Sequence, residues 1–85
     1  MNKESLNNPS RIVSELESEF VELYKILKFE GIADSGGAAK QAISDGLVSV
    51  NGQVETRKSK KIGPGDQIEV RGQTIDVIAK GDDQD

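Results

Sequence analysis

The sequence predicts an α+β fold in which two short helices pack on a small antiparallel sheet with hairpins. Residues 22–45 hold two segments in which apolar side chains recur at helical spacing, each followed by a glycine. Residues 47–56 place Asn51-Gly52 between two apolar runs, which is the strongest short signal for a β-hairpin. Residues 67–78 alternate apolar and polar side chains around a further turn, as strands with one buried face do.

Length and composition limit the functions open to the chain. Its 85 residues suit one small domain. The absence of cysteine excludes a disulfide framework and a cysteine zinc site, and the absence of histidine removes the commonest general base and metal ligand. We therefore expect no enzyme, no cofactor, no metal site and no small-molecule substrate.

Targeting signals are also missing from the sequence. No apolar run approaches the ~18 residues that a membrane helix needs. The polar N-terminus lacks the apolar segment of a signal peptide. We expect a cytoplasmic protein without a membrane partner, and we take a monomer as the expected state.

Charge is distributed unevenly along the chain. The net charge of −4 comprises −3 in residues 1–22, +3 in residues 23–62 and −4 in residues 63–85. A polyanion responds to the local field within about a Debye length, ~8–10 Å, more than to the net charge. The basic middle of the chain is therefore the feature that bears on nucleic-acid binding.

The secondary structure of the N-terminal part of the chain is the hardest to predict from the sequence. Residues 1–9 are polar and are predicted to form a disordered lead-in. Between residues 10 and 20, helical spacing and a short strand are both compatible with the pattern, and neither is preferred. The apolar residues there are Ile12, Val13, Leu16 and Phe20. We expect residues 10–79 to form a single domain and residues 80–85 an acidic, mobile tail.

Two helices are predicted next. The first covers residues 22–30, and Gly31 is its expected C-cap because glycine adopts the left-handed conformation at little cost. Asp34 or Ser35 would cap the second helix through a side-chain oxygen. Gly46 ends it.

Strands and turns fill the rest of the predicted domain. Asn51-Gly52 would form a type I′ turn, and the Gly-Pro-Gly-Asp sequence at residues 63–66 a type II turn. The predicted strands are residues 47–50, 53–56, 67–70 and 74–78. The predicted core consists of Phe20, Leu23, Leu27, Ala39, Ile43, Val48, Val50, Val54, Ile68, Val70, Ile75 and Val77.

These motifs occur in an order that resembles a known family. From Ser35 the chain reads Ser-Gly-Gly-Ala-Ala-Lys-Gln-Ala-Ile, and then come Gly46, Val48, Val50-Asn51-Gly52 and Gly65-Asp66. The order is similar to that of S4-type RNA-binding domains, over roughly residues 22–79. Residues 27–31, 35–40 and 55–58 most resemble the small standalone S4-like proteins of bacteria.

The resemblance implies an RNA-binding module with helices and a loop on one surface. Many S4 domains carry Arg directly after the serine that starts the second helix, whereas this chain has Gly36. The resemblance therefore assigns no side-chain contact to that position. It assigns a basic position to Lys40.

A basic segment supplies the strongest candidate contacts. Arg57, Lys58, Lys60 and Lys61 place four cations within five residues, a charge density suited to phosphate contacts. The alternative is a solvated loop that aids solubility. The full set of candidate RNA-binding residues is Lys25, Lys28, Ser35, Lys40, Gln41, Arg57, Lys58, Lys60 and Lys61. For Ser35, plain capping of the helix is the favoured interpretation.

The aromatic content indicates which kind of RNA would be bound. Phe20, Tyr24 and Phe29 are the only aromatic residues, and the first two have the spacing of core residues. A single-strand binder stacks bases on exposed aromatic rings. Structured RNA, ribosomal or transfer RNA among the options, is the better expectation because it is recognised through shape and phosphates.

Two functions from different classes remain compatible with the sequence. The leading hypothesis is a non-catalytic module that contacts the phosphates of structured RNA. The alternative is a protein-interaction adaptor whose acidic ends face a basic partner, such as a ribosomal protein or an RNA-processing enzyme.

Overall fold

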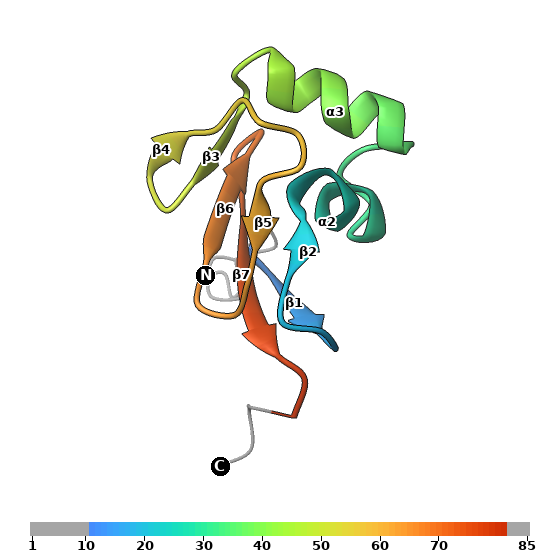
Figure 1. The fold of residues 1–85 in the computed structure, drawn as a ribbon. Coiled ribbons are helices and arrows are strands. Elements are labelled where there is room, and N and C mark those ends of the chain that lie inside the picture. The colour runs from blue at the N-terminus through green and yellow to red at the C-terminus, as the bar shows by residue number, and fades with distance from the viewer. Residues whose placement is uncertain (1–10, 82–85) are drawn as a thin grey trace, which may run out of the picture.

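The computed structural model describes residues 11–81, and its α+β architecture confirms the predicted fold class (Figure 1). Two helices and seven strands lie in this range. They are β1 (Arg11–Leu16), β2 (Val21–Glu22), α2 (Leu23–Phe29), α3 (Gly36–Ser44), β3 (Val48–Val50), β4 (Gln53–Val54), β5 (Lys61–Ile62), β6 (Gln67–Val70) and β7 (Gln73–Ala79). The predicted lead-in, residues 1–9, lies outside the described residues, as do residues 82–85 of the predicted tail.

The larger sheet is mostly antiparallel. Its strand order is β1-β7-β6-β3-β4, and β2 and β5 form a separate two-stranded pair. The β3/β4, β3/β6 and β6/β7 pairs are antiparallel, whereas β1 lies parallel to β7, from Arg11 opposite Thr74 to Leu16 opposite Ala79. The sequence pattern did not predict this parallel pair, because it joins opposite ends of the chain.

The segment that the sequence left open between helix and strand contains a strand. Along β1, Ser14 and Leu16 are buried while Val13 and Glu15 are exposed. This period of two is the signature of a strand with one buried face. Pairing with β7 decides the conformation, and such a distant partner is invisible to local pattern.

Both helices begin and end close to the predicted positions. Ser35 is the N-cap of α3, and its Oγ accepts a hydrogen bond from the Ala38 backbone N–H at 3.1 Å. Gly31 follows α2 with a φ of 75°, the left-handed conformation expected after a helix end. The predicted N-cap role of Ser35 is therefore confirmed, whereas the C-cap of α2 is Glu30 and Gly31 is the left-handed residue that follows it.

The Asn51-Gly52 turn is hydrogen-bonded to the turn at residues 63–66 and the strand that follows it. Its φ angles of 53° and 87° are both positive, as a type I′ turn requires. The Asn51 side chain accepts a hydrogen bond from the Gln67 backbone N–H at 2.9 Å and donates one to the Asp66 carboxylate at 3.0 Å. The two turns are thereby tied together at one end of the sheet.

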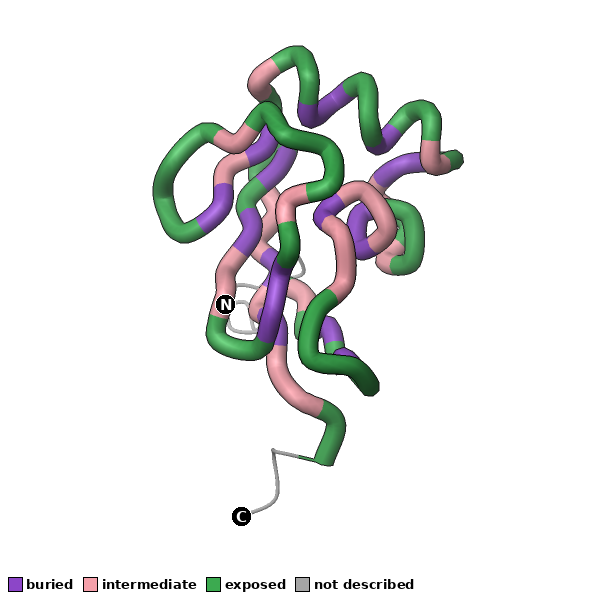
Figure 2. The backbone as a smooth tube through the Cα atoms, viewed as in Figure 1, coloured by how far each residue is buried: buried purple, intermediate pink, exposed green. Residues whose placement is uncertain are grey.

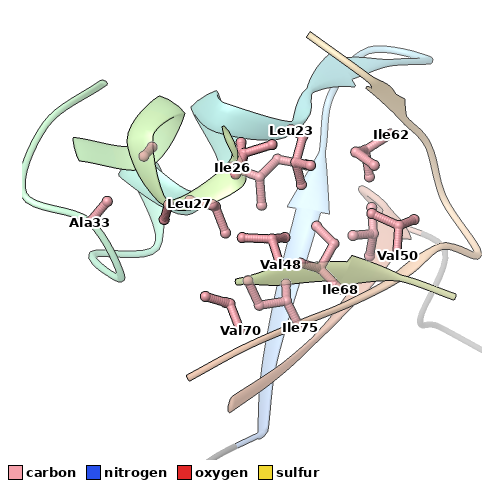
Figure 3. Close-up of a cluster of buried hydrophobic side chains, with 14 of the residues drawn as sticks. Leu23, Ile26, Leu27, Ala33, Val48, Val50, Ile62, Ile68, Val70 and Ile75 are labelled. Carbon is pink, nitrogen blue, oxygen red and sulfur yellow. The ribbon is translucent and has the colours of Figure 1, made fainter. Parts of the chain in front are cut away.

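A single apolar cluster joins α2, α3 and one face of the sheet. Figure 3 shows Leu23, Ile26 and Leu27 directed from α2 toward the sheet, where they meet residues such as Ile68 and Ile75. Figure 2 shows buried and exposed positions alternating along the strands. The buried apolar residues are Leu16, Leu23, Ile26, Leu27, Ala33, Ala39, Ala42, Ile43, Val48, Val50, Ile62, Ile68, Val70, Ile75 and Val77.

Two residues of the predicted core lie at the surface instead. Phe20 is 55% exposed and Val54 is 63% exposed. Phe20 precedes β2 and lies outside the helix that its spacing suggested. Val54 lies opposite Ser49, which points to the sheet face away from the helices. In their place, Ile26 and Ile62 are fully buried.

Candidate nucleic-acid interface

The basic loop, residues 57–61, is held against the start of α2 by backbone hydrogen bonds. The Leu23 N–H donates to the Lys60 carbonyl at 2.9 Å, and the Tyr24 N–H donates to the Lys58 carbonyl at 3.3 Å. The first N–H groups of a helix have no partner within the helix. The loop satisfies two of them with its backbone carbonyls, so this contact does not use its basic side chains.

Strand pairing fixes the end of this loop. In the short β2/β5 pair, Lys61 lies opposite Glu22 and Ile62 lies opposite Val21. Ile62 is fully buried, whereas Lys61 is exposed. Because side chains alternate along a strand, burial of Ile62 turns Lys61 outward.

Tyr24 brings lysines from both helices together. The Lys40 Nζ lies 4.5 Å from the centroid of the Tyr24 ring, and the Lys25 Nζ lies 6.0 Å from it. Both distances fall within the range of cation–π attraction. A Cβ on Gly36 would lie 3.8 Å from two ring carbons, so the start of α3 also borders the ring. Lys25 and Lys40, 15 residues apart in sequence, therefore share one surface.

Lys25 also has an acidic partner within its own helix turn. Its Nζ lies 2.9 Å from the Glu22 carboxylate. The hydrogen bond between them lowers the pKa of Glu22 and raises the pKa of Lys25. Both side chains are about 40–45% exposed, so solvent screens the pair, and it positions Lys25 more than it stabilises the fold.

Arg57 is held by a carboxylate of the preceding strand end. Its Nε lies 2.8 Å and its Nη2 3.2 Å from the Glu55 carboxylate, which also accepts the Arg57 backbone N–H at 3.1 Å. The side-chain hydrogen bond from Arg57 lowers the pKa of Glu55 to about 2. Arg57 therefore shapes the start of the basic loop, and its charge is partly compensated there.

The remaining predicted cations make no ion pair with a residue of the described range. They are Lys28, Lys40, Lys58, Lys60 and Lys61. A surface hollow is lined by Arg57, Ser59, Lys60 and Lys61. These charges and this hollow are what the surface offers to an anion such as a phosphate.

Ser35 and Gln41 take part in bonds within α3. The Ser35 hydroxyl oxygen accepts the cap hydrogen bond, and the Gln41 Nε2 donates to the Asp45 carboxylate at 2.9 Å. Gln41 is thereby directed along the helix toward its C-terminal end. Among the predicted residues, it is the one most clearly drawn away from the lysines at Tyr24.

Sequence reasoning missed the residues that organise this surface. Tyr24 has core spacing, yet its ring is half-buried and lies under two lysines. The phenol group of Tyr24 could have indicated a position at the surface, because tyrosine combines an apolar body with a polar tip that reaches solvent. Glu55 and Glu22 were counted only as charges, and pairing across a turn becomes visible only once the backbone is placed.

The opposite face of the sheet has a different character. Glu69 is exposed between buried Ile68 and Val70, and Glu15 is exposed beside buried Ser14 and Leu16. These positions point away from the helices. Glu15 and Glu69 therefore lie on the sheet face that the helices do not cover.

Neither a metal site nor a membrane span is found in the described part of the chain. Within residues 11–81, no group of three His, Cys, Asp or Glu side chains could hold a metal ion. No helix in that range is long and apolar enough to cross a membrane.

A comparison of the sequence with known protein families identifies a family that covers this arrangement of elements. The model of the S4 domain matches residues 14–78, a range that contains both helices, the Asn51-Gly52 hairpin and the basic loop. The chain belongs to the S4 domain family. The motifs that the sequence showed only in their order, from the Ser35 cap to the Gly65-Asp66 turn, are thus those of an S4 domain.

Two curated relatives align with about two thirds of the chain. YbcJ of Escherichia coli (strain K12) is 48% identical over 59 residues, which are 69% of this chain and 84% of YbcJ. A Bacillus subtilis (strain 168) protein named "Probable ribosome maturation protein RlbA" is 33% identical over 57 residues, 67% of this chain and 80% of RlbA.

Two solved structures are similar to this fold. The solution structure of YbcJ from E. coli, described as revealing an αL motif involved in RNA binding, matches with a TM-score of 0.62 and 40% identity over 85% of this chain and 90% of that chain. The 30S ribosomal protein S4e of Thermoplasma acidophilum matches with a TM-score of 0.53 and 26% identity, over 67% of this chain and 30% of that chain.

Proposed function

We propose that this S4 domain protein binds structured RNA without catalysing a reaction. Phosphates of the RNA would contact the basic helix-and-loop surface. The observation that carries the proposal is the arrangement of lysines from α2, α3 and the basic loop around Tyr24 and the start of α2. The contacting cations would be Lys25, Lys28, Lys40, Arg57, Lys58, Lys60 and Lys61.

Neutral side chains would add hydrogen bonds to these contacts. The Ser35 oxygen accepts the helix-cap bond, which leaves its O–H proton available to a phosphate oxygen. Gln41 uses one amide proton on Asp45 and keeps the other. Each would contribute less than a lysine, because neutral hydrogen bonds are weaker than charge-assisted ones.

The relatives support RNA of the ribosome as the class of target. YbcJ is described with an αL motif involved in RNA binding, RlbA is named for ribosome maturation, and S4e is a ribosomal protein. Under this proposal the protein works in the cytoplasm as a monomer and needs no cofactor.

The test compares two variants that lose the same charge. Lys60→Gln with Lys61→Gln removes two cations of the basic loop. Arg11→Gln with Lys80→Gln removes two cations at the β1/β7 edge, each of which pairs with a carboxylate there. In filter binding to ribosomal RNA, the loop variant should bind about tenfold or more weakly than wild type. Equal losses in the two variants would contradict a localised RNA surface.

The adaptor hypothesis keeps one structural observation in its favour. The exposed acidic residues on the outer sheet face could meet a basic protein. A pull-down from bacterial lysate with and without RNase separates the two functions. If ribosomal proteins captured in the pull-down are lost after RNase digestion, the result supports RNA binding. If they are retained, it supports the adaptor.

A further inference from the structure

Phe20 is an exposed aromatic ring at the border of the basic loop. Its side chain is 55% exposed. The Ser18 hydroxyl donates a hydrogen bond to the Phe20 carbonyl at 2.9 Å, which fixes the local backbone. A Cβ on Gly63 would lie 3.6 Å from the ring Cδ1 and 3.1 Å from the Glu19 carbonyl oxygen. The ring is therefore supported by the Gly63 backbone and remains accessible elsewhere.

A surface hollow opens beside this ring. Its lining consists of Phe20, Val21, Glu22, Ser59 and Lys61. The Lys61 Nζ lies 5.8 Å from the ring centroid. The Glu22 carboxylate is 2.9 Å from the Lys25 ammonium, so its negative charge is compensated where it borders the hollow. An apolar ring, a hydroxyl and an ammonium thus converge on one small space.

Ser59 and Lys61 connect this hollow to the phosphate-binding candidates. Both residues also line the neighbouring hollow, together with Arg57 and Lys60. A nucleic-acid backbone that follows the cations of the basic loop would therefore pass the Phe20 ring within one nucleotide. The Lys61 Nζ and the Phe20 ring centroid are 5.8 Å apart, so one nucleotide could reach both.

We propose that this hollow takes one unpaired nucleotide of the bound RNA. Its base would stack on the Phe20 ring, and its phosphate would contact Lys61. The inference rests on the proposed function and sharpens it, because it requires an RNA with an unpaired base next to its paired region. Stacking on an aromatic ring is available to every base, so this contact reads an unpaired position and not a sequence.

Phe29 provides a matched control for Phe20. It is 68% exposed and lies at the other end of α2. Within the described residues no lysine or arginine side chain lies over its ring, unlike Phe20 with Lys61. Phe29→Leu and Phe20→Leu therefore remove the same group from two accessible places, only one of which adjoins the basic loop.

The experiment uses two synthetic RNAs, a fully paired hairpin stem and the same stem with one bulged adenine analogue whose fluorescence reports stacking. Wild type, Phe20→Leu, Phe29→Leu and Lys61→Gln are titrated against both at constant salt. Wild type should prefer the bulged stem and quench the analogue. Phe20→Leu should lose about tenfold in affinity for the bulged stem and keep its affinity for the paired stem.

The outcomes distinguish this inference from the proposed function. Phe29→Leu should behave as wild type on both RNAs, and Lys61→Gln should weaken both. If Phe20→Leu binds and quenches the bulged stem as wild type does, the stacking site is wrong while RNA binding stands. If wild type binds neither stem, the proposed function itself fails. Thermal unfolding confirms that Phe20→Leu is folded.

Discussion

At the scale of single residues, Tyr24 has the most consequences for the candidate surface. Its backbone N–H holds the Lys58 carbonyl, and its ring lies 4.5 Å from the Lys40 ammonium. One residue thus positions a lysine of α3 and a lysine of the basic loop. A cation that is already held near its binding position loses less side-chain freedom when a phosphate binds.

Replacement of Tyr24 tests this organising role. Tyr24→Leu keeps an apolar body but removes the ring, so RNA affinity should fall about two- to fivefold, the value of one exposed cation–π contact. Tyr24→Phe retains the ring and should bind as wild type does. The measurement is the dissociation constant for ribosomal RNA at fixed salt. Identical affinities for the Leu and Phe variants would show that the ring does not position Lys40.

Substitutions of Ser35 can distinguish its role as a helix cap from its place in the proposed RNA-binding surface. Ser35→Ala removes the hydrogen bond to Ala38, which should cost about 1 kcal/mol and lower the unfolding temperature by about 4–8 °C. Ser35→Asp restores a cap but adds a negative charge beside the lysines. It should therefore unfold near the wild-type temperature and bind RNA more weakly than Ser35→Ala does. Calorimetry and filter binding measure the two effects, and an unchanged unfolding temperature for Ser35→Ala would refute the cap.

At the scale of elements, the basic loop is held in place at its beginning, along its backbone and at its end. Leu23 and Tyr24 hold it at the start of α2, Ile62 anchors its end in the core, and Glu55 binds Arg57 at its beginning. Four cations within five residues repel one another. Fixing the loop at these places offsets that repulsion and keeps the cations on one surface.

The Glu55–Arg57 pair predicts a pH dependence. The pKa of Glu55 is lowered from 4.5 to about 2 in the folded chain. Because the folded state favours the ionised carboxyl, the pair's stabilisation is complete above about pH 4.5 and is lost as the pH falls toward about 2. An NMR titration of the Glu55 carboxyl should give this low value in wild type. Arg57→Gln should move it back toward 4.5, and a wild-type value near 4.5 would contradict the pair.

Local chemistry explains which elements the sequence could predict. Gly31, Ser35 and Asn51-Gly52 act through their own backbone conformation or through a hydrogen bond within a few residues, so their roles are visible in the sequence. The β1/β7 pair and the burial of Ile62 depend on partners about 40 to 60 residues away. No local period encodes such pairing, because register is decided where the strands meet.

At the scale of the whole molecule, the fold gathers the basic residues of the middle of the chain apart from exposed glutamates of the sheet. The cations of the basic middle lie at the start of α2, on the adjoining face of α3 and in the basic loop. Exposed glutamates lie on the outer face of the sheet. A polyanion would therefore be attracted most strongly to the surface that gathers the lysines. A net charge of −4 is compatible with RNA binding for this reason.

The residues alone predicted only the contiguous part of the candidate site, and the family resemblance was needed to expect the helices and the loop on one surface. Arg57 to Lys61 are adjacent in sequence, so their charge density was apparent without a structure. The neighbourhood of Lys25, Lys40 and Tyr24 arises because α3 packs beside α2. The surface position of Phe20 arises because the chain forms β2 and not a longer helix.

The most direct test of the central claim is the salt dependence of RNA binding by the wild-type chain. The logarithm of the binding constant for ribosomal RNA is measured against the logarithm of salt concentration. If about four lysines displace counterions from phosphates, the slope should be about −3 to −4. A slope near zero would mean that the basic surface does not bind the RNA backbone, and the proposed function would be wrong.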